Sequence, residues 1–567
     1  MPVVPAPDRR RLLGWMPWAI AAALPPLVLA LVRAGSSDDA RWWFVAGLLY
    51  WSMPAVVLFA LAAGIVRWRA AATPWRVALR RWLPGAVAAV VLTGALFLAV
   101  PPTMRVQFDE TSLVNTSLTM HRHRAAMMTV GAVPFEGDFV GVDNTIDKRP
   151  PLFSFLASVL HDVTGPRVAN AFVLNAMLLT ILLFAAFAAV RERLGLAAAF
   201  AAQMLLLAVP LTTIVATSAG FDLLAATLFA VTLLAAHDFG QQPTNARFVA
   251  FLGAGMLFAQ SRYESLFAFV LLFALVAWRA RGHWRPSAGA KAALALCPLL
   301  VTPLLFLLEI ARNPNFYPEA GGAPLVGWTH FAAHVGPWLR EWFRPALDNP
   351  LPGVVGIAAL ATWIAVAGKR AVARPDFLLL LPLLAVTGLV MCWFSGGVDD
   401  PIALRLYLPF ACFTALSPLA VVGLVGRRAA PWLLAAAAGL AAWRTAEVAN
   451  GRAFPPLAAA RVVAAVEGAI GRSGVDARTT LWVTTMAQHL VTTGRAAVCP
   501  MAFAARVNEI GHLVAQHEVH TICVIETPFD EALAGGYGHP RDVLGSRPRQ
   551  VLVRADGDVA VTVLRLR

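Results

Sequence analysis

Residues 83–111 have the sequence LPGAVAAVVLTGALFLAVPPTMRVQFDET, in which a long apolar run is followed closely by two carboxylates. The apolar part, about 83–101, is long enough to cross a hydrocarbon core of about 30 Å as a helix. Asp109 and Glu110 would then lie near a membrane surface, where charged groups are costly unless they are solvated or paired. The stretch therefore predicts a membrane protein with a site at one face of the bilayer, and a solvated loop is the alternative.

The rest of the chain repeats the apolar pattern. Of its 567 residues, 59% are hydrophobic and only 14% are charged, which a soluble chain could not carry without exposing large apolar patches. Apolar runs of spanning length recur to about residue 447, and a soluble domain follows. We expect an all-α membrane domain with about thirteen spans, near residues 14–33, 43–66, 83–101, 168–190, 196–215, 219–236, 247–261, 265–279, 289–310, 351–368, 376–395, 402–425 and 430–447.

The formal charge of +14 does not indicate a nucleic-acid partner, because its arginines lie in short loops between apolar runs. Basic loops alternate with loops such as 395–401 that carry acidic residues. This alternation places the N-terminus in the cytoplasm, with Arg9–Arg11 before an uncleaved anchor. The loops 102–167 and 311–350 and the C-terminal domain are then extracytoplasmic, in a multi-pass protein of the cell inner (plasma) membrane.

The C-terminal part has the pattern of an α/β domain. We divide the chain into N-terminal transmembrane helices (1–82), a transmembrane catalytic domain (83–447) and an extracytoplasmic α/β domain (448–567). Cys499 and Cys523 could form a disulfide in an oxidising compartment, with two unpaired thiols as the alternative. In the α/β domain we expect helices near 461–470 and 503–516, strands at 480–484 and 521–526, and a final hairpin of 550–554 with 559–566.

Five motifs follow one another along the chain. They are Phe108-Asp109-Glu110-Thr111, Asp147-Lys148-Arg149-Pro150-Pro151-Leu152-Phe153, Gly220-Phe221-Asp222, Arg262-Tyr263-Glu264 and Arg405-Leu406-Tyr407-Leu408-Pro409. Together they resemble GT-C-fold glycosyltransferases, in particular the bacterial branch of the protein O-mannosyltransferase family, which includes the lipid A aminoarabinose transferase. The resemblance covers about residues 83–425, with two further spans before it.

The resemblance implies inverting transfer of a sugar from a polyprenyl-phosphate-linked donor to an acceptor at the outer face. A hydroxyl acceptor needs a positioned carboxylate to take its proton, and Asp109 is the candidate base with Glu110 as its competitor. The leaving lipid phosphate needs cationic donors. Lys148, Arg149, Arg262 and Arg405 are the candidates, with Lys148 and Arg149 both eligible for the family's basic position.

Other interpretations stay open. Asp222 and Asp147 would contact donor sugar hydroxyls or a divalent metal ion, although Asp222 could simply cap a helix. No cofactor beyond such an ion is implied, and the partners are the lipid-linked donor, an unidentified acceptor and membrane lipid. A transporter or flippase for a lipid-linked intermediate is the alternative function, but transporters tend to place polar groups at the bilayer midplane in paired repeats. A third possible function is that of a family member that only binds a polyprenyl lipid and transfers no sugar.

Overall fold

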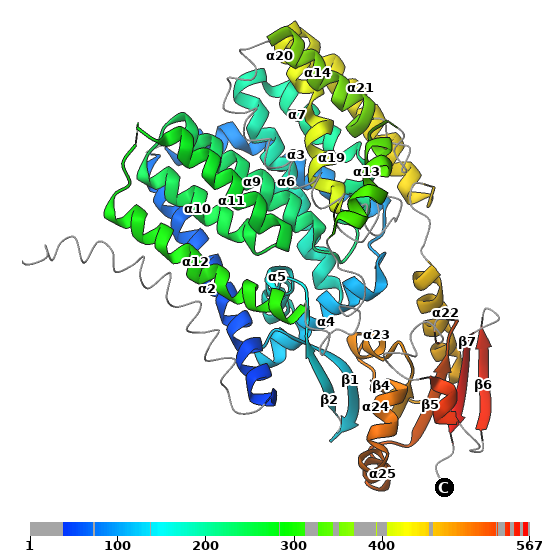
Figure 1. Ribbon diagram of the computed structural model, residues 1–567. Helices are drawn as coiled ribbons and strands as arrows, with labels where there is room; N and C mark the ends of the chain where they lie inside the picture. Colours follow the sequence, from blue (N-terminus) through cyan, green and yellow to red (C-terminus); the bar gives the residue numbers. More distant parts are fainter. Residues whose placement is uncertain are drawn as a thin grey trace, which may run out of the picture.

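The membrane domain is a bundle of long apolar helices (Figure 1). The computed structural model describes residues 38–71, 74–136, 138–282, 284–311, 327–343, 351–367, 393, 405–452, 458–528, 530, 539–544, 549–555 and 559–564. Within them, seven segments are long and apolar enough to cross a membrane, or eight if a bent pair of helices is one span. These are α2 (Asp38–Ala70), α3 (Trp75–Ala99), α6 (Ala169–Leu194), α9 (Asp222–Gln241), α11 (Tyr263–Ala280), α12 (Ala288–Ala311), the segment formed by η3 (Arg405–Tyr407), α19 (Leu408–Leu416) and α20 (Pro418–Val425), and the bent pair α7 (Leu196–Leu207) and α8 (Pro210–Ala216).

Eight of the thirteen predicted spans thus match such segments among the described residues. The predicted spans 14–33 and 376–395 lie outside the described residues, except for residue 393. The other three are helical but too short or too polar to count with the rest. They correspond to α10 (Asn245–Ala259), to η2 (Leu351–Val355) with α14 (Gly356–Ala367), and to α21 (Ala430–Ala449), which follows η4 (Arg427–Ala429).

The break between α7 and α8 matters for the site. The two helices meet at 72°, and Pro210 begins α8. Proline lacks an N–H and disfavours helical geometry in the residue before it, so Val209 is extended and the span breaks there. The turn after α8 then reaches the link between α3 and α4 (Gln107–His123), where Thr103 N donates to Thr217 O at 3.0 Å.

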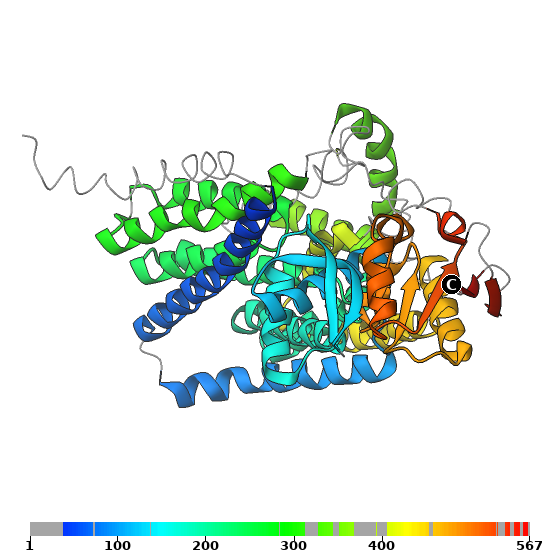
Figure 2. The same cartoon turned by 90° about the horizontal axis from the view of Figure 1, so that it is seen from below.

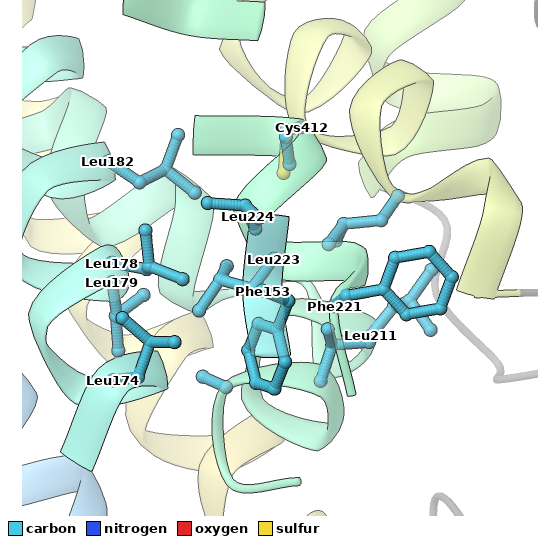
Figure 3. Packing of buried hydrophobic residues seen from close by; sticks show 14 of the residues in the cluster. Phe153, Leu174, Leu178, Leu179, Leu182, Leu211, Phe221, Leu223, Leu224 and Cys412 are labelled. Carbon is cyan, nitrogen blue, oxygen red and sulfur yellow. The ribbon is translucent and has the colours of Figure 1, made fainter. Parts of the chain in front are cut away.

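Between the bundle and a sheet lie α4 (Gln107–His123) and α5 (Leu152–Thr164). Phe153, at the start of α5, belongs to one buried cluster with Leu174 and Leu178 of α6 and Leu223 of α9 (Figure 3). Leu152 and Phe153 at the start of α5 are buried. Their burial holds the segment just before α5, which contains Arg149, in place.

The described residues form one sheet of strands β1 (Met127–Phe135), β2 (Asp138–Ile146), β3 (Thr480–Val483), β4 (Ala497–Val498), β5 (Thr521–Glu526), β6 (Arg549–Ala555) and β7 (Val559–Leu564). These seven described strands lie in the order β2-β1-β4-β3-β5-β7-β6. The central strands β3, β4 and β5 are parallel, and β1 pairs antiparallel with β4 through Ala132 and Ala497. A hairpin from the first predicted loop therefore completes the sheet of the C-terminal domain, as the close approach of hairpin and domain in Figure 2 shows.

The predicted α/β pattern of the C-terminal part is confirmed, with each expected strand present. The possible disulfide is not formed: Cys499 and Cys523 are both free, Cys523 being buried on β5. The remaining helices are α13 (Trp328–Phe343), α22 (Ala458–Ser473), α23 (Ala487–Thr492), α24 (Pro500–Ala505), α25 (Val507–Ala515) and α27 (Pro540–Leu544).

Candidate active site

The acidic pair lies in the first turn of α4, where its two side chains have different surroundings. Adjacent helical residues point about 100° apart, since a turn takes 3.6 residues. Asp109 faces arginine side chains, whereas Glu110 is buried against backbone N–H groups. The two carboxylates therefore cannot do the same work.

Asp109 is paired with two guanidinium groups that come from distant parts of the chain. Arg149 donates to Oδ1 of Asp109, and Arg405 donates to Oδ2. The two arginine side chains are each 14% exposed, and that of Asp109 is 26% exposed. Burial raises the pKa of Asp109, but the two guanidinium groups outweigh it and hold that pKa well below its usual range. Asp109 is thus an ionised carboxylate that remains partly open to solvent.

Asp147 supports Arg149 rather than facing an open space. Its side chain is 4% exposed, and its Oδ1 accepts from the Arg149 guanidinium at 2.7 Å and from the Arg149 backbone N–H at 3.1 Å. Thr116, two turns after Asp109 on α4, donates to the other oxygen at 3.4 Å. These contacts hold the Arg149 side chain against α4.

A second carboxylate lies beside Arg405. Asp222, at the start of α9, is 4% exposed and pairs with Arg262, while its Oδ2 lies 3.7 Å from Nε of Arg405. Arg262 also pairs with Glu264, and its guanidinium carbon lies 4.5 Å from the centre of the Phe221 ring. Asp222 is therefore an ion-pair partner of Arg262 in the first turn of α9, whose N-cap residue is Phe221.

These pairs form one chain of alternating charges that joins five segments distant in sequence. Between Asp109 and Asp222, Arg405 is the connecting residue. The order of the chain is Asp147, Arg149, Asp109, Arg405, Asp222, Arg262 and Glu264.

Arg405 has hydrogen-bonding capacity left over. Its Nε and Nη1 atoms are buried and make no hydrogen bond within the described part of the chain. A buried donor without a partner is costly, and guanidinium groups bind phosphate oxygens strongly. The arrangement can accept an anion at Arg405 without breaking an existing hydrogen bond.

Glu110 is buried and is surrounded by backbone N–H groups. Its side chain is 1% exposed, Oε1 accepts from Val106 N at 3.0 Å, and Oε2 accepts from Arg105 N at 3.1 Å and Ala219 N at 3.0 Å. Burial raises the pKa of Glu110, while these three N–H groups oppose the rise. Glu110 thus fastens the start of α4 to the turn that leads into Asp222.

Lys148 and Arg149, the two candidates for the family's basic position, make different contacts. The Arg149 guanidinium contacts Asp109, whereas the Lys148 backbone carbonyl accepts from the Tyr263 hydroxyl at 2.6 Å. That hydrogen bond joins the segment before α5 to the start of α11. Of the two eligible residues, Arg149 is the one in contact with the candidate base.

The carboxylates do not fit a divalent metal. Asp109, Asp147 and Asp222 each contact a guanidinium group, whose positive charge would repel a cation. In the described ranges, no group of three or more His, Cys, Asp or Glu residues is placed to hold a metal ion. His121 of α4, whose imidazole could also be a metal ligand, pairs with Asp162 at 2.6 Å.

Two residues near the site were missed by the sequence reasoning. Arg105, whose Nη2 donates to Thr217 Oγ1 at 3.0 Å, has the residue type expected for a site but belongs to no motif. Thr116 lies seven residues after Asp109, a spacing that puts both on one face of a helix. Helical spacing from Asp109 was the signal that could have found Thr116.

Two solved structures of ArnT from Cupriavidus metallidurans have a similar fold. The structure bound to undecaprenyl phosphate has a TM-score of 0.56 and 14% identity, covering 85% of this chain and 98% of that one. The apo structure has a TM-score of 0.55 and 13% identity, covering 86% and 98%. No protein-family model matches the sequence, and no curated protein matches it significantly. The multi-span bundle and this likeness together show that the chain has the GT-C-like glycosyltransferase fold that its motifs predicted.

Proposed function

We propose that the protein is a glycosyltransferase that moves a sugar from a polyprenyl-phosphate-linked donor to an acceptor hydroxyl, with inversion at the anomeric carbon. The observation that carries this proposal is the ionised Asp109, in the first turn of α4, held between Arg149 and Arg405. The ArnT structure bound to undecaprenyl phosphate supports a lipid phosphate as the leaving group.

In the proposed reaction, Nη1 of Arg405, which has no hydrogen-bond partner among the described residues, donates to the donor phosphate, and Arg149 adds a second positive charge. The acceptor oxygen forms a bond to the anomeric carbon as the bond from that carbon to the phosphate oxygen breaks. Asp109 takes the hydroxyl proton, and the electron pair of the broken bond goes to the phosphate. Buried guanidinium groups stabilise that growing negative charge more than they would in water.

Three further acidic or basic residues shape the site in this proposal. Asp222 lies beside Arg405, and its proposed role is to accept hydrogen bonds from donor sugar hydroxyls. Arg262 orients Asp222 and contributes positive charge near the donor. Asp147 keeps Arg149 in place. The charges gather at one end of the membrane helices, which favours a transferase over the alternative transporter.

The test measures sugar transfer by the purified protein in liposomes. The liposomes contain polyprenyl-phosphate-linked donors whose sugar is radiolabelled, and a cell-envelope extract is added as the source of acceptors. Wild-type protein should release polyprenyl phosphate and label the extract. Arg405→Gln should abolish this, while the matched control Arg428→Gln, at an exposed position, should not. Movement of the intact lipid-linked sugar across the bilayer without bond cleavage would contradict the proposal and favour the transporter.

A further inference from the structure

Helix α4 also contacts the C-terminal domain, through residues outside the chain of charges. Helix α23 packs against both α4 and β1 (Figure 1). Gln488 of α23 donates through Nε2 to Ser112 Oγ at 3.1 Å and to Met128 Sδ at 3.3 Å. Ser112 is one turn after Asp109 on α4, so the C-terminal domain reaches within one helical turn of the candidate base.

The contact continues to the backbone beside Asp109. Ser112 Oγ donates to the carbonyl of Phe108 at 2.8 Å while it accepts from Gln488. Phe108 directly precedes Asp109. A hydroxyl that both donates and accepts is restricted in its rotation, and linked hydrogen bonds strengthen one another. The Gln488 amide thereby holds the first turn of α4 from the side of the sheet.

A parallel contact lies one turn further along α4. Asn115 Nδ2 donates to Thr492 Oγ1 at 3.0 Å and to Thr129 O at 2.9 Å, and Asn115 Oδ1 accepts from Thr129 N at 2.6 Å. Thr492 in turn donates to the carbonyl of Gln488 at 2.7 Å. Helices α4 and α23 and strand β1 therefore share one group of directional hydrogen bonds.

The start of α4 is held by contacts with other segments, not by a side-chain cap. Its N-cap residue is Val106, which makes no side-chain hydrogen bond to the first turn. Here Glu110 fastens one side of the first turn, and Ser112 with Gln488 fastens another.

We propose that Gln488 is a positioning residue through which the C-terminal domain keeps Asp109 between Arg149 and Arg405. This inference rests on the proposed function. Gln488 touches neither donor nor acceptor in this role, and it acts only through α4. A displacement of about 1 Å at a reacting group can cost about 100-fold in rate, so loss of a single hydrogen bond at this place can be large.

The experiment compares Gln488→Ala with Gln516→Ala, the same substitution at an exposed position of the same domain. Gln488→Ala should lower kcat about tenfold to 100-fold with the KM for the lipid-linked donor unchanged, since the donor-phosphate contacts stay in place. Hydrogen exchange should rise in residues 107–116 of α4. Gln516→Ala should change neither. Combined with Asp109→Asn, Gln488→Ala should cause no further loss of turnover.

Ser112→Ala removes the same link by a change in α4, outside the C-terminal domain. It therefore separates loss of the link from misfolding of the C-terminal domain. It should reproduce the kcat loss, and the double variant with Gln488→Ala should lose no more than either single variant. Unchanged exchange in α4, or faster exchange with normal kcat, would overturn the inference. If the wild type transfers no sugar, the proposed function fails, and the exchange measurement alone decides whether Gln488 holds α4.

Discussion

The adjacent carboxylates Asp109 and Glu110 allow a matched pair of isosteric substitutions. Asp109→Asn removes the proton acceptor but keeps the side-chain shape, and a positioned base contributes about 10²–10⁴-fold in rate. Breaking a buried ion pair costs about 3–5 kcal/mol when it leaves a charge uncompensated. Here Arg149 keeps Asp147 and Arg405 keeps Asp222, so the loss in the free energy of unfolding should be smaller.

Glu110→Gln should behave in the opposite way. An amide oxygen placed where Oε2 lies can keep the hydrogen bonds from Arg105 N and Ala219 N, but the amide NH₂ then faces Val106 N–H. The loss of one hydrogen bond to a charged group predicts a fall of about 1.5–3 kcal/mol in the free energy of unfolding. Turnover per folded molecule should fall less than in Asp109→Asn.

The assay combines thermal unfolding in detergent with single-turnover release of polyprenyl phosphate from bound donor. The expected pattern is a folded, donor-binding Asp109→Asn protein with turnover reduced at least about 100-fold. A less stable but active Glu110→Gln protein should accompany it. Near-normal transfer by Asp109→Asn would refute the assignment of the base, as would a Glu110→Gln protein of normal stability that had lost all turnover.

Three further outcomes follow from the structure. Arg149→Gln removes one of the two guanidinium groups that lower the pKa of Asp109, so the pKa of Asp109 should rise. As the pH is lowered, the variant should then lose activity at a higher pH than the wild type does. A pH–rate profile measures this shift. Cys499 and Cys523 are unpaired, so alkylation of the denatured protein should label both equally with and without reductant. A fragment of residues 448–567 should aggregate or stay unfolded, because it lacks the hairpin that pairs with the two-residue strand β4; fusing the hairpin to it should improve its solubility in size-exclusion chromatography.

The sequence alone was enough for the bundle and for most of the C-terminal elements. Spanning helices follow from apolar length, since every backbone polar group must be satisfied within the helix in lipid. The strands at 480–483 and 521–526 follow from short β-branched and aromatic runs. The motifs were also enough to name the residues that meet at Asp109, because their order along the chain matched a known arrangement. Orientation across the membrane stays a prediction from loop charge.

Only the tertiary structure decided how those residues divide their roles. Asp109 and Glu110 are chemically alike in sequence, but helical geometry turns one toward arginines 40 and 296 residues away and the other toward backbone N–H groups. The joining of the β1–β2 hairpin to the C-terminal sheet likewise depends on one pairing, Ala132 with Ala497, that leaves no local pattern. Local sequence determined which segments become helices or strands, because apolar periodicity is a property of neighbouring residues. Packing between distant segments decided which carboxylate pairs with arginines and stays partly open to solvent, because burial and ion pairing arise only when those segments meet.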